Sequence, residues 1–335
     1  MRKKLTFKGL WKVMKDSFTG FSDDKVLKLS GALAYYTLFT MAPLLIVIIF
    51  VCSLFFGRAN TENSIYSQIQ GFVGPDTALQ LQQIITNASL EGKSSISLVI
   101  GIITLIIGAT TVFAEIQDSI NMIWGLKPKP KKGWLKMLKN RLLSFSVIIG
   151  LGFLLLVSLG VSAILEALNK KLQAIFPDVT VILFYILNLV ITFSVITILF
   201  AAIFKVLPDA LIKWRDVIAG SIATAILFML GKFGISFYIS QSNIGSTYGT
   251  AGSLVVLLLW VYYSAAILYF GAEFTKFYAL RYGSAIHPDH YAVVTKTVEV
   301  EAENGTSVQQ ATKEVKEEKK VAKAEAQERE NKENG

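Results

Sequence analysis

The stretch FGISFYISQSNIGSTYGTAGSLVVLLLWVYYSAAILYFGA, residues 233–272, decides the fold of this chain because its 40 residues include no charged side chain. A helix crosses the hydrocarbon core of a bilayer with about 20 mostly apolar residues, so the stretch is too long for one crossing. The polar, glycine-containing segment 241–249 is typical of a turn. Together with the apolar residues that begin at Val217, the stretch predicts two membrane spans, near 217–240 and 250–273.

Four further runs without charge precede this stretch, and each has the length of a membrane span. They predict spans near 30–56, 95–123, 142–165 and 179–204. The first run is much longer than the apolar core of a cleavable signal peptide. The composition agrees, since 53% of the residues are hydrophobic and 17% are charged, against about 25% charged in soluble domains. We therefore expect an all-α polytopic membrane protein with six transmembrane helices, residues 29–286.

The basic residues predict the orientation of these spans. Lys and Arg number eight, two, seven, two, three and none in segments 1–28, 58–93, 124–141, 166–178, 205–216 and 241–249. Because basic residues are enriched in cytoplasmic segments, this alternation places both termini in the cytoplasm. On the same basis we expect Trp124, Trp134 and Trp214 in an aromatic belt at the inner interface.

The net charge of +9 is thus explained by orientation, and it does not require a nucleic-acid partner. The basic run KPKPKK at 127–132 lies beside two predicted spans. Such a run contacts anionic lipid headgroups. We therefore expect membrane lipids as partners and no nucleic acid.

The N-terminal segment 1–28 has the pattern of an amphipathic helix. One predicted face holds Phe7, Leu10, Trp11, Met14 and Phe18, and off it lie Lys8, Lys12 and Lys15. Two interpretations stay open: a helix that lies in the membrane interface, and a helix docked on the transmembrane domain.

The composition changes at residue 287. Residues 287–335 hold eight basic and eleven acidic side chains and one aromatic residue, which predicts a disordered, charged cytoplasmic tail. The predicted outer loop 58–93 contains a second amphipathic pattern after Pro75, which fits a helix that caps the spans or lies on the membrane.

Three residues inside the predicted spans are candidate pathway residues. Lys232 lies about 24 Å along a helix from Asp216, where it either faces a cavity or extends to the outer interface. Asn188 either forms an interhelical hydrogen bond or lines a polar cavity. Pro43 should kink the first span, because it removes a backbone donor.

Charged residues also lie where spans are expected to reach the cytoplasm. Glu115 and Glu273 end the second and sixth spans, and Arg141, Arg215 and Asp216 are predicted at the same level. These side chains form either a charged gate or the boundary with water.

The sequence offers little for other chemistry. One cysteine forms no intramolecular disulfide, and two histidines, His287 and His290, are few for a zinc site. The glycine-rich segment 245–253 lacks the GK[ST] ending of a phosphate-binding loop. We therefore expect no metal, no cofactor and no catalytic residues, and hence no enzyme.

Several motifs lie along the chain: SGALAYYT at 30–37, FAEIQDSINMIW at 113–124, Pro208-Asp209, WRDV at 214–217 with Gly220, and Tyr238, Tyr248-Gly249, Ser253, Leu259-Trp260 and Gly271-Ala272-Glu273. Together they resemble the YihY/BrkB family of bacterial membrane proteins. The resemblance covers roughly residues 10–280.

The resemblance implies a six-span protein of the bacterial inner membrane, and it supplies no agreed catalytic or binding residues. Some members carry a ribonuclease BN label. Three functions remain open at this point: transport of a lipid or an anionic metabolite, which we favour, a membrane-associated ribonuclease, and a non-catalytic membrane scaffold. The ribonuclease interpretation is poorly supported, because RNA hydrolysis needs a metal cluster or an acid–base pair outside the bilayer.

Overall fold

The structure is a computed structural model. It describes residues 6–40, 66, 79, 82, 95–128, 177–242, 252–289 and 292–295. These residues belong to one compact unit, Met1–Thr295. The tail from Lys296, the predicted span 142–165, most of the loop 58–93, and Pro43, Trp134 and Arg141 lie outside the described residues.

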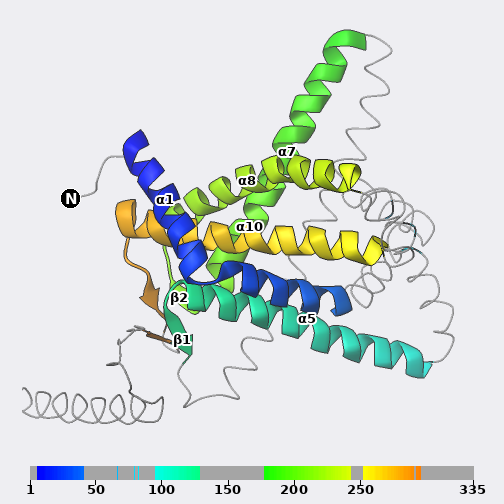
Figure 1. Ribbon diagram of the computed structural model, residues 1–335, viewed down its shortest axis with the longest axis horizontal. Coiled ribbons are helices and arrows are strands. Elements are labelled where there is room, and N and C mark those ends of the chain that lie inside the picture. The colour runs from blue at the N-terminus through cyan, green and yellow to red at the C-terminus, as the bar shows by residue number, and fades with distance from the viewer. Residues whose placement is uncertain are drawn as a thin grey trace, which may run out of the picture. The chain divides into compact units, whose positions relative to one another are not determined.

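Four long helices coincide with predicted spans (Figure 1). They are α5 (Ser95–Ile123), α7 (Pro177–Val206), α8 (Trp214–Gln241) and α10 (Gly252–Tyr282). Residues 26–40, at the start of the first predicted span, are also helical. In the described part, three segments are long and apolar enough to cross a membrane: Ile186–Val206, Trp214–Ile239 and Leu254–Tyr282. The count of six spans remains a prediction.

Helix α10 packs against α8, α5 and the N-terminal helix α1 (Phe7–Asp23). Figure 1 shows α8 and α10 running side by side. By contrast, α7 exposes many large apolar side chains, including Ile182, Ile186 and Val190. Exposed apolar surface of this kind suits contact with lipid.

Small residues bring α8 and α10 close together. Gly220 of α8 faces the Thr275 side chain, and Thr224 of α8 faces Gly271 of α10 so closely that a Cβ on either glycine would overlap the threonine. The two pairs run in opposite directions, so the helices are antiparallel. Both threonine hydroxyls donate to the carbonyl four residues earlier, Gly220 O and Gly271 O, at 2.7 Å. This interface has the small-residue spacing that membrane helices use for close packing.

Helix α1 docks on α10 through a face of small residues. It begins after Thr6, whose hydroxyl accepts a hydrogen bond from Gly9 N at 3.2 Å. The buried residues of α1 are Gly9, Val13, Ser17 and Gly20. Lys25, with φ of 52°, turns the chain into the helix at 26–40. Helix α1 is therefore docked on α10, mainly through its small residues, with Leu10 and Met14 of the predicted apolar face partly buried beside them. A position in the membrane interface stays a prediction.

Two short antiparallel ladders join segments that are far apart in the sequence (Figure 1). Strand β1 (Leu126–Pro128) pairs with β4 (Ala292–Val294), and β2 (Ala210–Leu211) pairs with β3 (His287–Pro288). The predicted boundary of the disordered tail at residue 287 is thus too early. Backbone pairing with β1 and β2 orders a segment whose composition alone would not fold.

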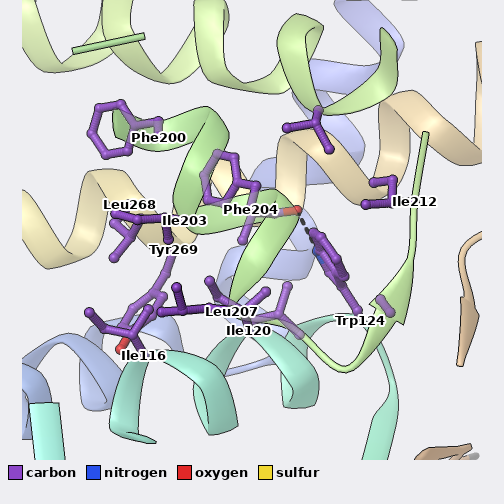
Figure 2. Packing of buried hydrophobic residues seen from close by; sticks show 14 of the residues in the cluster. Ile116, Ile120, Trp124, Phe200, Ile203, Phe204, Leu207, Ile212, Leu268 and Tyr269 are labelled. Carbon is purple, nitrogen blue, oxygen red and sulfur yellow. Dashed lines mark hydrogen bonds between the residues drawn. The ribbon is translucent and has the colours of Figure 1, made fainter. Parts of the chain in front are cut away.

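The largest hydrophobic cluster lies where α5, α7 and α10 meet, beside these ladders. Figure 2 shows Ile120, Phe204 and Leu207 packed around Tyr269 and Trp124. Trp124 is 7% exposed and its indole Nε1 donates to the carbonyl of Ala272 at 3.0 Å. The prediction that Trp124 belongs to an interfacial belt is therefore wrong, because a helix carbonyl satisfies its N–H inside the protein. Trp214, in contrast, is 56% exposed.

Candidate functional site

The loop between α7 and α8 is fixed by Asp209. Its carboxylate accepts hydrogen bonds from Gln117 Nε2 at 3.2 Å and from Asn121 Nδ2 at 3.1 Å, both on α5. Asn121 Oδ1 accepts the Asp209 backbone N–H at 2.9 Å, and Asp289 N donates to Asp209 O at 2.9 Å. Asn121 is 2% exposed, so its amide would be costly to leave unpaired, and Asp209 satisfies it from a half-buried position. Asp209 thus connects α5, the α7–α8 loop and the β3–β4 segment.

The first turn of α8 is tied to the end of α10 by a buried carboxylate. Asp216 Oδ2 accepts hydrogen bonds from the backbone N–H and the hydroxyl of Ser284, each at 3.1 Å. A carboxylate in the first turn of a helix also interacts favourably with the helix dipole. Asp216 is 2% exposed, so its role in this structure is to join α8 to the chain after α10.

A second acidic residue, Glu273 of α10, is completely buried. The Lys276 ammonium lies 3.2 Å from Glu273 Oε2 and 3.2 Å from Asp24 Oδ2, at the end of α1. The Lys276 ammonium thus bridges the Glu273 and Asp24 carboxylates. Gly20 makes room for this group, because a Cβ there would lie 2.7 Å from Glu273 Oε2.

Polar side chains continue from Glu273 towards α5. Tyr269 precedes Glu273 by four residues on α10, and it lies beside Ser119 and Glu115. The Ser119 hydroxyl donates to Glu115 Oε1 at 3.5 Å. Within the described part of the chain, Glu273 Oε1 and the Tyr269 hydroxyl are buried without a geometrically good hydrogen-bond partner. We call this set the polar row: Glu115, Ser119, Tyr269, Glu273, Lys276 and Asp24.

The sequence-predicted site residues separate into two groups in the structure. Glu115 and Glu273 belong to the polar row, where Tyr269 and Ser119 lie between them. Lys232 is half-buried on α8, and Arg215 is exposed in the first turn of the same helix. Asn188 is exposed on α7 and accepts a hydrogen bond from Thr192 Oγ1 at 3.5 Å within that helix. The described residues do not include an interhelical partner for it. Within the described part of the chain, Arg215 forms no ion pair with Glu115 or Glu273.

Sequence reasoning did not identify Asp24, Lys276 or the Asp209 contacts as parts of a site. A signal for Asp209 was present, because Gln117, Asn121 and Pro208-Asp209 all lie in motifs of the family resemblance. No comparable signal marks Asp24, whose contact with Lys276 spans 252 residues. Over the described ranges, no three His, Cys, Asp or Glu side chains are arranged to hold a metal ion.

Comparison with known protein families gives one profile match that covers most of the chain. The profile described as "Virulence factor BrkB" matches residues 17–293. The matched region contains the polar row, the Asp209 contacts, the β2–β3 ladder and the β1–β4 ladder up to Val293.

Curated relatives from bacteria are named UPF0761 membrane proteins. One from Nitrosospira multiformis is 26% identical over 254 residues, which cover 75% of this chain and 57% of the relative. One from Saccharophagus degradans is 28% identical over 273 residues, covering 80% of this chain and 60% of the relative. The chain thus spans somewhat more than half of these relatives. For one from Pseudoalteromonas atlantica, 27% identical, the share is 81% of the relative. No solved structure matches the chain significantly.

Proposed function

Because the chain belongs to the virulence factor BrkB family of membrane proteins, we propose that it is a multi-pass protein of the bacterial inner membrane that moves a lipid or an anionic metabolite across the bilayer. The polar row is the proposed gate on this route. The curated names of the relatives say only that they are membrane proteins, so transport is our own inference.

The observation that carries the proposal is the burial of Glu273. Its side chain is 0% exposed, and one of its carboxyl oxygens has no hydrogen-bond donor among the described residues. Ionisable groups inside membrane helices are costly and are retained where they act on an ion or a substrate. A buried ion pair such as Glu273–Lys276 often stabilises a protein no more than apolar side chains of the same volume would, so stability alone does not account for it.

The charges of the polar row favour a gate that changes state. Two carboxylates, Glu273 and Asp24, share the ammonium of Lys276. Among the described residues, Lys276 is the only cation that bridges these two carboxylates, so one negative charge of the pair is left over unless a carboxyl carries a proton. Uptake or release of one proton therefore changes the attraction between α1 and α10.

An anionic substrate fits the basic residues around the same end of the helices. Lys205, Lys213 and Arg215 lie at the junction of α7 and α8, and Lys205 Nζ is 5.7 Å from the centre of the Trp214 ring. Such residues attract the headgroups of anionic lipids and other anions. Lys232, further along α8, is the proposed contact for the anion inside the membrane.

Proteoliposomes test the proposal with two probes. Fluorescent NBD-phosphatidylglycerol, quenched by external dithionite, reports lipid movement, and radiolabelled glycerol phosphate reports metabolite movement. We expect the protein to move one probe faster than empty liposomes do, and Lys232→Met and Glu273→Gln to abolish that movement at unchanged protein level. Asp23→Asn, an exposed residue next to the row, is the matched control and should keep full activity.

Two results would overturn parts of the proposal. If neither probe moves, the scaffold interpretation replaces transport. If a probe moves equally well with Lys232→Met and Glu273→Gln, transport stands but the route does not include these residues.

We propose further that the chain is not a ribonuclease. Purified protein should leave tRNA intact in the presence of magnesium. Cleavage that survives purification and is lost in Glu115→Gln or Asp209→Asn would establish the enzyme instead.

A further inference from the structure

Helix α1 leaves its aromatic face open after it has docked. Phe7, Trp11 and Phe18 are 87%, 68% and 61% exposed. The three side chains lie on one side of the helix, because they are spaced by four and seven residues. The small residues that bind α10 lie on another side of the helix. Docking therefore leaves Phe7 and Trp11 uncovered, and Phe18 touches Phe270 of α10 only along one side of its ring.

Lysines border this aromatic face. Lys8, Lys12 and Lys15 are exposed and lie on the side of the helix away from the docked face. Three faces therefore divide the surface of α1: the small residues that contact α10, the exposed aromatic residues next to them, and the lysines beyond the aromatic residues. A helix with large apolar side chains beside a row of lysines is the pattern of helices that lie in a membrane interface.

The level of α1 along α10 agrees with an interface position. The 31 residues of α10 span about 46 Å, whereas the hydrocarbon core of a bilayer is about 30 Å thick. Helix α10 therefore extends beyond the core. Helix α1 lies along its C-terminal part: the Phe18 ring is 4.8 Å from the Phe270 ring, and Gly9 contacts Tyr282. If α10 is centred on the core, it extends about 8 Å beyond it at each end, so Tyr282 and the Gly9 end of α1 lie at the level of the headgroups.

We infer that the aromatic face of α1 binds the headgroup region of the bilayer, with anionic phospholipids held by Lys8, Lys12 and Lys15. The aromatic rings occupy the boundary between headgroups and acyl chains, and the ammonium groups contact phosphates. This surface depends on the chain being embedded in a membrane, and it does not depend on transport. A second copy of the chain fits less well, because it would bring a further row of lysines to the same edge.

Site-directed spin labelling of the full chain tests this inference. Single cysteines replace Trp11, Phe18 or Lys12 in a Cys52→Ser background, and the labelled protein is reconstituted in vesicles of phosphatidylethanolamine and phosphatidylglycerol. Oxygen collects in lipid and a nickel chelate collects in water, so the ratio of their collision rates measures depth. We expect this ratio to be severalfold higher at positions 11 and 18 than at position 12.

Two outcomes would overturn the inference. A label at position 11 that meets the nickel chelate as often as the label at position 12 would show that the face lies in water. Labels at positions 11 and 18 that meet neither reagent would show that a protein surface, such as a second copy, covers the face.

The lipid charge gives a second measurement. Vesicles of phosphatidylcholine alone should reduce the depth ratio at position 11, and a variant with Lys8, Lys12 and Lys15 all replaced by Gln should lose the difference between the two lipid compositions. If the depth ratio at position 11 stays the same with both changes, the face does not bind anionic lipids selectively. Melting of the variants in detergent checks that α1 remains docked.

Discussion

At the scale of single residues, Lys276 holds together two carboxylates that would otherwise face each other. We expect Lys276→Met to lower the melting temperature of the purified protein, since the buried Glu273 carboxylate then loses its cation and repels the partly exposed Asp24. The double variant Lys276→Met/Glu273→Gln should recover part of the loss, because one of the two charges is gone. Melting followed by tryptophan fluorescence in detergent measures both.

Lys12→Met serves as the control, because it removes an exposed lysine of α1. Equal melting of Lys276→Met and the control would show that the charges of the polar row do not stabilise the contact between α1 and α10. If the changes in stability caused by Lys276→Met and Glu273→Gln simply add in the double variant, the two side chains do not interact.

The sequence located single charged residues well and their partners poorly. The ends of the charge-free runs placed Glu115 and Glu273 at one level, and both lie in the polar row. The partner Asp24 could not be found this way, because hydropathy carries no information on contacts between distant segments. Trp124 shows the same limit, since an aromatic residue at the end of a span looks identical whether lipid or a carbonyl of α10 surrounds its indole.

At the scale of elements, the α8–α10 contact depends on glycines with no space for a side chain. We expect Gly220→Ala and Gly271→Ala each to destabilise the protein by about 1–3 kcal/mol, because the added methyl group overlaps Thr275 or Thr224. Gly234→Ala is the matched control on α8, because no atom lies within 4 Å of the new Cβ. Similar melting temperatures for all three variants would contradict the close packing.

The described helices were predictable from the sequence and the ladders were not. Length and the absence of charge located α5, α7, α8 and α10 to within a few residues, apart from the longer C-terminal end of α10. Strands of two or three residues have too few positions to show a period. Residues 287–294 in addition lie at the start of a segment with the composition of a disordered tail. Only their pairing partners, far earlier in the chain, make them ordered.

At the scale of the whole molecule, the ladders constrain how often the chain crosses the membrane. They bring residues 126–128, 210–211 and 287–294 to the same end of the helices. The chain between two segments on one side must cross an even number of times. Helices α8 and α10 are long and apolar enough to supply two crossings after residue 211. Before residue 210, α7 would supply one and the predicted span 142–165 the other.

The predicted topology can be measured by cysteine labelling in intact cells. In a Cys52→Ser background, a membrane-impermeant maleimide should label a cysteine at Ser246 from outside. It should label cysteines at Lys12 and Lys213 only after the inner membrane is opened. Labelling of Lys213→Cys in intact cells would refute the six-span arrangement with both termini in the cytoplasm.

The two ladders also set an order of events during synthesis. Pro128 pairs with Ala292, so β1 leaves the ribosome long before its partner exists. At about 5–20 residues per second, the wait is roughly ten to thirty seconds. During this time the earlier spans are already in the membrane, but nothing from β3 or β4 yet fixes their ends. The β1–β4 pairing therefore forms only after α10 has been synthesised, so it locks the ends of the earlier helices late in the assembly of the protein.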